Sequence, residues 1–241
     1  MPNFVGKMTI NYSPNFDVPK RNKKDIRYII FHYTGMKNDN LAIKKLINAK
    51  SKVSCHYYIN KNGKIIQMVP ELYTAWHAGK SKWKKVKSLN KHSIGIEISN
   101  PGHYYGYKKF NHKQITSLIK LSKYLLKKYK IKKNNILGHS DIAPLRKKDP
   151  GEKFPWQHLS KNKVGIWHKF KKNKKKNLYL DKTDVSKISF LKKLKKFGYS
   201  VDHSNISEFK KIVKSFQRRF RPELIDGKID NECEMIIKSL I

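Results

Sequence analysis

The chain has 241 residues and a formal net charge of +38, from 55 lysines and arginines against 17 aspartates and glutamates. Hydrophobic residues make up 38% of it, which is enough for a folded interior and excludes an intrinsically disordered chain. Cys55 and Cys233 form no CxxC pair, which argues against a disulfide framework and a thiolate zinc site. The positive charge predicts attraction to polyanions, such as an anionic cell-wall polymer or nucleic acid; the alternative is a compositional bias toward lysine.

The first predicted elements are strands and one short helix. The apolar run RYIIFHYT, residues 27–34, predicts a buried strand with His32 near its end. Residues 41–49 have apolar positions at helical spacing. Two β-rich runs between residues 54 and 69 flank Asn62-Gly63, a pair that readily supplies the positive φ of a tight turn. These runs therefore predict a β-hairpin.

Further along the chain, strand and helix patterns continue. In SIGIEIS, residues 93–99, the isoleucines alternate with other residues, so Glu97 is expected to point away from the isoleucine face. Residues 113–129 have apolar positions at helical spacing with lysines between them, which predicts an amphipathic helix covering a sheet.

The composition changes after Trp167, where a lysine-rich stretch leaves little to bury. Beyond it, three runs of apolar residues at helical spacing predict a small all-α unit. We therefore expect a main domain over residues 1–168, a basic linker over 169–186 and a helical domain over 187–241.

The N-terminus lacks a basic start followed by an apolar run, and no stretch approaches the roughly 20 apolar residues of a membrane span. The expectation is a cytoplasmic protein with no transmembrane segment. Action in the periplasm or at the cell envelope is the alternative.

Three residues indicate a metal site. His139 and Asp149 lie ten residues apart in GHSDIAPLRKKDPG, residues 138–151, where a looped chain could bring the two side chains together. His32, at the end of a buried strand, would complete the three protein ligands of a catalytic zinc site with an open fourth position. Zinc lowers the pKa of a coordinated water to roughly 7. Glu97 could then serve as the base, and Lys147 could stabilise a developing oxyanion.

Four motifs in this order resemble those of the type 2 N-acetylmuramoyl-L-alanine amidases, which are related to peptidoglycan recognition proteins. They are HYTG at 32–35, AWHAG at 75–79, SIGIEISNPG at 93–102 and GHSDIAPLRKKDPG at 138–151. The resemblance runs from about Ser13 to Trp156. It implies an α/β fold with a central mixed β-sheet flanked by helices, and hydrolysis of the bond between the lactyl group of muramic acid and L-alanine.

The same resemblance implies the roles of individual residues. His32, His139 and Asp149 would bind one Zn²⁺ ion, while Glu97 and Lys147 would be catalytic. Residues expected to contact the substrate are Tyr33, Trp76, His77 and Asn100; for Asn100, a role in a turn before Pro101 is the alternative. His56 stands where related amidases have a histidine that is not a zinc ligand.

Residues 186–241 resemble the helical peptidoglycan-binding modules found beside such amidases, and a tether to the wall would raise the local substrate concentration. The expected partner is peptidoglycan or a muropeptide, and the protein is expected to be a monomer.

A non-catalytic recognition protein is one rival function, but every predicted zinc ligand and both predicted catalytic residues are present. A nucleic-acid-binding protein is another rival, but the sequence has no recognisable nucleic-acid-binding motif. A recycling or remodelling enzyme and a phage endolysin both remain open.

Overall fold

A six-stranded mixed sheet forms the centre of the structure, a computed structural model that describes residues 8–170, 187–201 and 206–241. In spatial order the strands are β1 (Met8–Ile10), β5 (Ile65–Gln67), β4 (Tyr57–Ile59), β9 (Ser93–Ile98), β3 (Tyr28–Tyr33) and β10 (Ile136–Gly138). Neighbours run parallel, except that β4 and β5 are antiparallel. This pair is the predicted hairpin, and Gly63 in its turn has a φ of +76°.

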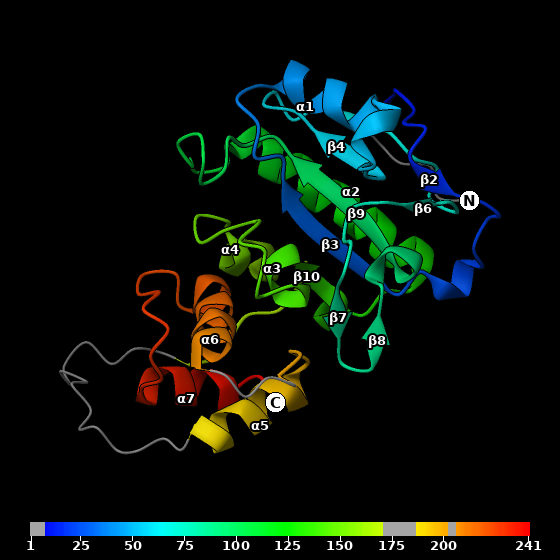
Figure 1. Cartoon of the computed structure of the whole chain (residues 1–241). Helices are drawn as coiled ribbons and strands as arrows, with labels where there is room; N and C mark the ends of the chain where they lie inside the picture. The colour runs from blue at the N-terminus through cyan, green and yellow to red at the C-terminus, as the bar shows by residue number, and fades with distance from the viewer. Residues whose placement is uncertain (1–7, 171–186, 202–205) are drawn as a thin grey trace.

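Smaller elements surround this sheet (Figure 1). Two additional sheets have two strands each, β2 with β6 (Phe16–Asp17, Thr74–Ala75) and β7 with β8 (Lys82–Trp83, Val86–Lys87). The short 3₁₀ helices are η1 (Lys23–Asp25), η2 (Ala49–Ser51), η3 (Leu89–His92) and η4 (Lys133–Asn135). The expected fold class, a mixed sheet flanked by helices with a helical C-terminal part, is confirmed.

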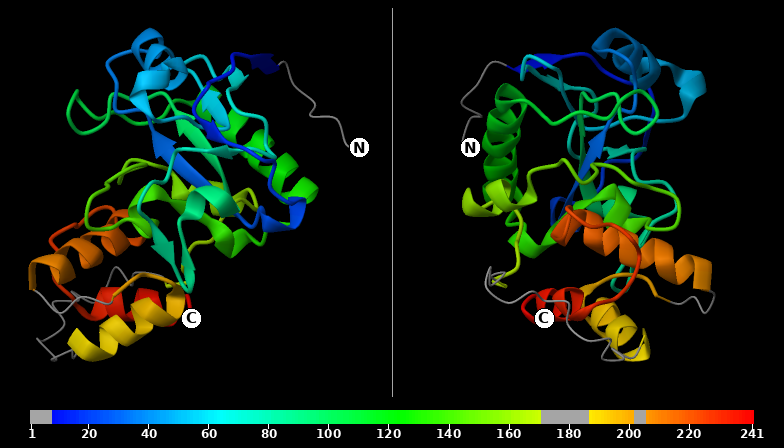
Figure 2. Two further views of the ribbon diagram at one scale, coloured as in Figure 1. Left: turned by 45° about the vertical axis from the view of Figure 1, so that its right-hand side comes forward. Right: turned by 90° about the vertical axis from the view of Figure 1, so that its left-hand side faces the viewer.

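Helix α2 (His112–Tyr129) covers one face of the sheet, as Figure 2 shows. Asn111 and Gln114 form a capping box at its start, so the first backbone N–H groups of the helix are satisfied. Buried apolar residues at helical spacing then pack against Ile29 and Phe31, which point to this side of β3. The short helix α4 (Trp156–Lys161) adds Trp156 to the same core.

The opposite face of the sheet is covered in two places. Helix α1 (Asp39–Ile47) packs Ala42 and Leu46 against Tyr58 and Ile66 of the hairpin strands. At the other end, near β10, lies α3 (His139–Ile142). Helices α1 and α3 belong to separate hydrophobic clusters. The candidate functional residues described below lie on this face of the sheet.

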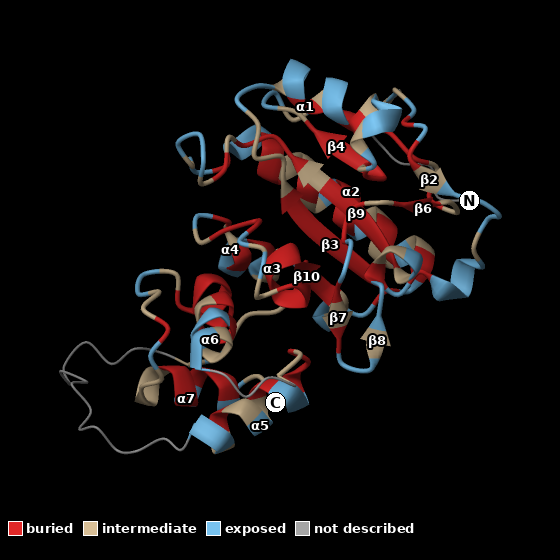
Figure 3. Ribbon diagram, viewed as in Figure 1, coloured by how far each residue is buried: buried red, intermediate tan, exposed pale blue. Residues whose placement is uncertain are grey.

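The C-terminal helices pack on the β10 end of the same face. They are α5 (Lys187–Phe197), α6 (Ile206–Phe220) and α7 (Asn231–Lys238). Their buried sides, red in Figure 3, share one hydrophobic cluster with Tyr28, Ile30 and Leu137 of the sheet. Most of the predicted linker, residues 171–186, lies outside the described residues, and the division into domains stays a prediction. The shared cluster nevertheless joins the helices directly to the sheet.

Candidate metal centre and substrate cavity

Adjacent strands place His32 and Glu97 side by side. In the register of the sheet, His32 of β3 is the partner of Glu97 on β9, which in turn is the partner of Tyr58 on β4. Partners in register on neighbouring strands project to the same face of a sheet. An imidazole and a carboxylate therefore stand next to each other near the carboxyl ends of two central strands.

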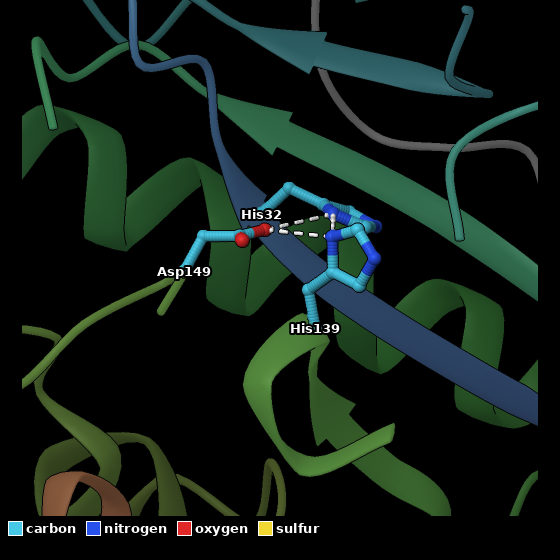
Figure 4. Close-up of side chains that lie close together, drawn as sticks. All are labelled: His32, His139 and Asp149. Carbon is cyan, nitrogen blue, oxygen red and sulfur yellow. Dashed lines mark hydrogen bonds and ion pairs between the residues drawn. The ribbon is translucent and has the colours of Figure 1, made fainter. Parts of the chain in front are cut away.

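His139 and Asp149 reach the same place from the segment after β10. His139 is the first residue of α3, and a hydrogen bond from the Ser140 amide to the Asp149 carbonyl, 2.8 Å long, draws the following loop back toward that helix. The Nδ1 atoms of His32 and His139 lie 3.0 Å apart, and each lies 3.0 Å from Oδ2 of Asp149 (Figure 4). Among the described residues, these three form the one cluster that could hold a metal ion. The structure thus brings together the three predicted ligands.

Burial and mutual charge set the protonation of this cluster. Burial, together with the nearby His139, lowers the pKa of His32 to about 4, so its ring is neutral at pH 7. Burial by itself would raise the pKa of Asp149. The charge of His139 and the close contacts of both imidazoles with its Oδ2 outweigh it, and the pKa lies below its usual value. A carboxylate and a neutral imidazole are the protonation states that metal ligands require.

The far nitrogen of each imidazole also has a protein partner. Nε2 of His139 lies 3.0 Å from the carbonyl oxygen of Ala78, and Nε2 of His32 lies 3.0 Å from Nδ1 of His77. Nη2 of Arg146 also lies 3.3 Å from Nε2 of His139, so this edge of the ring is held by two neighbours.

Glu97 faces a cavity of about 400 Å³ that also contains His139 and Asp149 in its wall. Its Oε2 is buried and has no hydrogen-bond partner in the structure. Burial, together with the negative charge of Asp149, raises the pKa of Glu97 well above its usual value, although the charge of Lys147 opposes this shift. A buried carboxylate oxygen without a partner is costly, and such groups are typical of catalytic sites.

The other predicted site residues lie in or near this cavity. Lys147, Tyr33, Trp76 and His77 all line it. The Tyr33 hydroxyl is 2.8 Å from Nδ1 of His103, and Trp76 donates to Asp17. Whether any of them contacts a substrate stays a prediction.

Asn100 lies just outside this wall and has both ends of its side chain engaged. Its Nδ2 donates to the Lys108 carbonyl, and its Oδ1 accepts from the Gly102 amide. These two hydrogen bonds fit the alternative given for Asn100, a role in the turn before Pro101. Its contact with a substrate stays a prediction.

Sequence reasoning missed three cations in the cavity wall, Lys45, Arg146 and Lys148. Lysines are so abundant in this chain that no local sequence pattern distinguishes Lys45 and Lys148 from the others. Arg146 donates to the carbonyls of Ala78 and Lys80, so it also holds the AWHAG segment beside the three candidate ligands.

The C-terminal helices contact α3 directly, which the sequence did not indicate. Ser215 of α6 donates to the Ser140 carbonyl over 2.6 Å, and Arg219 forms a buried ion pair with Asp141. The Tyr199 hydroxyl donates to the same carboxylate over 2.7 Å. The helix that begins with His139 is therefore held by residues from the far end of the chain.

Comparisons with known proteins point to one family. Residues 22–152 match the family model described as N-acetylmuramoyl-L-alanine amidase. The amidase AmiD of Escherichia coli is 36% identical over 233 residues, which covers 90% of this chain and 82% of that protein. The 1,6-anhydro-N-acetylmuramyl-L-alanine amidase AmpD of Haemophilus influenzae is 32% identical over 163 residues, covering 60% of this chain and 86% of that protein.

Two solved structures extend the similarity to the C-terminal helices. E. coli AmiD in complex with anhydro-N-acetylmuramic acid-L-Ala-D-gamma-Glu-L-Lys has a TM-score of 0.78 at 36% identity, covering 90% of this chain and 88% of that one. AMPDH3 from Pseudomonas aeruginosa in complex with anhydromuramic pentapeptide has a TM-score of 0.77 at 30% identity, covering 96% and 97%. No helix in the described parts of the chain is long and apolar enough to cross a membrane. The resemblance read from the four sequence motifs is confirmed, and the chain belongs to the N-acetylmuramoyl-L-alanine amidase family.

Proposed function

We propose that this amidase is zinc-dependent, with His32, His139 and Asp149 as ligands, and that it cleaves the lactyl–L-alanine amide of anhydromuropeptides. The observation that carries the proposal is the convergence of three ligand atoms beside a carboxylate that has a buried oxygen without a partner. Two imidazoles and one carboxylate form a donor set found in catalytic zinc sites.

The residues fit a cation for a simple electrostatic reason. Oδ2 of Asp149 carries negative charge, and Nδ1 of His32 and Nδ1 of His139 each lie 3.0 Å from it. A metal ion at this point would be coordinated by all three atoms and attracted by the carboxylate.

A bound zinc ion would supply a Lewis acid that polarises a carbonyl and makes water more acidic. Glu97 would accept the proton of the attacking water and later deliver it to the departing L-alanine nitrogen. Its raised pKa suits both transfers, because a base that must also act as an acid works best with a pKa near the working pH. The Lys147 ammonium would stabilise the negative charge that develops on the lactyl carbonyl oxygen.

The cavity wall and the relatives support an anhydromuropeptide as substrate. Lys45, Arg146 and Lys148 add positive charge to a cavity that would receive the carboxylates of a stem peptide. The AmiD and AMPDH3 structures compared above are complexes with anhydromuramyl peptides. Both structures also match the C-terminal helices, so the similarity is not confined to the metal centre.

The test incubates purified protein, stripped of metal and then reloaded with zinc, with a soluble anhydromuropeptide and with intact sacculi. Mass spectrometry should detect free stem peptide from the anhydromuropeptide in the zinc-loaded reaction and none after chelation. No free stem peptide from either substrate would refute the amidase proposal. Release from sacculi alone would refute the anhydromuropeptide preference.

A pair of glutamate variants tests the base. Glu97→Gln should bind zinc normally while kcat falls by about 10²–10⁴-fold. Glu71→Gln is the matched control, because Glu71 is also buried but accepts hydrogen bonds from Tyr57 and Tyr129 on the α2 side of the sheet. It should lose stability and keep its kcat. A Glu97→Gln protein that retains kcat within a factor of ten would eliminate Glu97 as the base.

A further inference from the structure

His77 lies against the metal ligand His32, and both of its ring nitrogens have partners in the protein. Nδ1 is 3.0 Å from Nε2 of His32, and Nε2 is 3.2 Å from the Ser93 hydroxyl. We propose that His77 is a positioning residue, which fixes the tautomer and orientation of His32 so that its Nδ1 lone pair faces the metal. This inference rests on the proposed metal site.

The directions of these hydrogen bonds follow from the last acceptor in the series, the Leu89 carbonyl. The Ser93 hydroxyl is 2.6 Å from the Leu89 carbonyl, which can only accept, so Ser93 donates its one proton there. The hydroxyl oxygen then accepts from Nε2–H of His77. Nδ1 of neutral His77 is left with a lone pair, and it accepts from Nε2–H of His32.

The consequence reaches the metal centre. With its proton on Nε2, neutral His32 presents an unprotonated Nδ1 toward Asp149 and His139. The Leu89 carbonyl therefore determines, through two intervening side chains, which nitrogen of His32 is free.

The sheet leaves room for this ring at one position. Gly95 of β9 lies under His77, and a Cβ atom at Gly95 would fall 2.3 to 2.6 Å from three atoms of the imidazole. Gly95 is also the register partner of Ile30, two positions before the pair His32 and Glu97 and therefore on the same face of the sheet. The glycine in SIGIEIS is thus explained by the space that His77 occupies.

Neighbouring backbone groups hold the segment that carries His77. The amides of His77 and Ala78 both donate to Oδ1 of Asn90, over 3.2 and 2.7 Å. The Ala78 carbonyl oxygen in turn lies 3.0 Å from Nε2 of His139. Two consecutive residues therefore orient both ligand imidazoles, one through its side chain and the other through its carbonyl. Loss of such an outer partner weakens metal binding by about 10–100-fold in other metalloproteins.

The experiment measures zinc affinity of the full chain by competition with a chelator, together with the visible absorption of the cobalt(II)-loaded protein. His77→Leu keeps apolar bulk and removes the acceptor for His32, so zinc affinity should fall about 10–100-fold with an altered cobalt spectrum. His77→Asn keeps an acceptor oxygen near the position of Nδ1 and should recover most of the affinity. Ser93→Ala frees His77 to take the opposite tautomer, and we expect an intermediate loss.

His168→Leu is the matched control, because the His168 ring is also partly buried and its Nε2 contacts a carbonyl, that of Phe220, away from the three ligands. It should leave zinc affinity unchanged. Folded His77→Leu and Ser93→Ala proteins with wild-type affinity and spectrum would overturn the inference, as would equal losses in His77→Leu and His77→Asn. If His77→Leu does not fold, the other two variants decide. A wild-type protein that binds no zinc would instead refute the proposed metal site.

Discussion

Replacing Arg219 by methionine tests whether the C-terminal helices are structurally coupled to the metal centre. The Arg219 guanidinium is 2% exposed and pairs with Asp141, whose side chain is 1% exposed. Asp141 lies two residues after His139 in α3. Methionine keeps much of the length of the side chain and removes the charge.

The expected loss of unfolding free energy depends on the hydrogen bonds that the Asp141 carboxylate keeps when Arg219 is replaced. Removing one partner of a buried ion pair costs about 3–5 kcal/mol, because the other charge stays buried. Asp141 would still accept hydrogen bonds from the Gly138 amide and the Tyr199 hydroxyl. We therefore expect the lower end of that range, about 3 kcal/mol of unfolding free energy.

The assay is equilibrium urea denaturation of Arg219→Met, Asp141→Asn and the double variant, all zinc-loaded. The double variant should be less destabilised than the sum of the single variants by about 1–3 kcal/mol, since the two residues act as a pair. Lys238→Met is the control, because its pair with Glu234 is 57% exposed on the lysine side and should contribute less than about 1 kcal/mol. A loss below 1 kcal/mol for Arg219→Met, or strict additivity, would refute the coupling.

Three further predictions concern pH, metal and packing. Burial raises the pKa of Glu97, and a base acts only when ionised, so kcat/KM should fall as the pH is lowered through a pKa above the ordinary glutamate range; a profile that stays flat down to pH 4.5 would contradict this. Chelation should abolish activity and lower Tm, and zinc at about 1,000 times its Kd should restore about 4 kcal/mol of stability; equal Tm values with and without zinc would contradict binding to the folded state. Phe216→Ala should cost about 3–5 kcal/mol, because Phe216 is fully buried in the cluster that includes Ile30 of the sheet. Differential scanning calorimetry should then show one transition shifted downward, whereas a separate early transition would contradict the shared core.

The candidate metal site and the position of Glu97 could be predicted because they depend on local patterns. His32 stands near the end of an apolar run, and Glu97 alternates with isoleucines, so both strands and the direction of the Glu97 side chain could be predicted from the sequence. The hairpin around Gly63 and the helix over 112–129 followed from turn chemistry and helical spacing in the same way.

What could not be predicted depends on pairing between distant segments. The register that sets His32 beside Glu97 joins residues 65 positions apart, and no local signal encodes it. His77 was expected at the substrate, whereas its contacts with His32 and Ser93 depend on the absence of a side chain at Gly95. That glycine is the one signal in the sequence that could have indicated the arrangement.

Arg219, which pairs with Asp141, also contacts the outer edge of strand β10. Within the described residues β10 pairs with β3 alone, so its other edge presents backbone groups that could pair with a strand of another molecule. Nη2 of Arg219 donates to the Ile136 carbonyl on this strand over 3.1 Å, and α6 lies against the adjoining α3. Cutting the chain before α5 would therefore remove this protection, and we expect the shortened protein to aggregate.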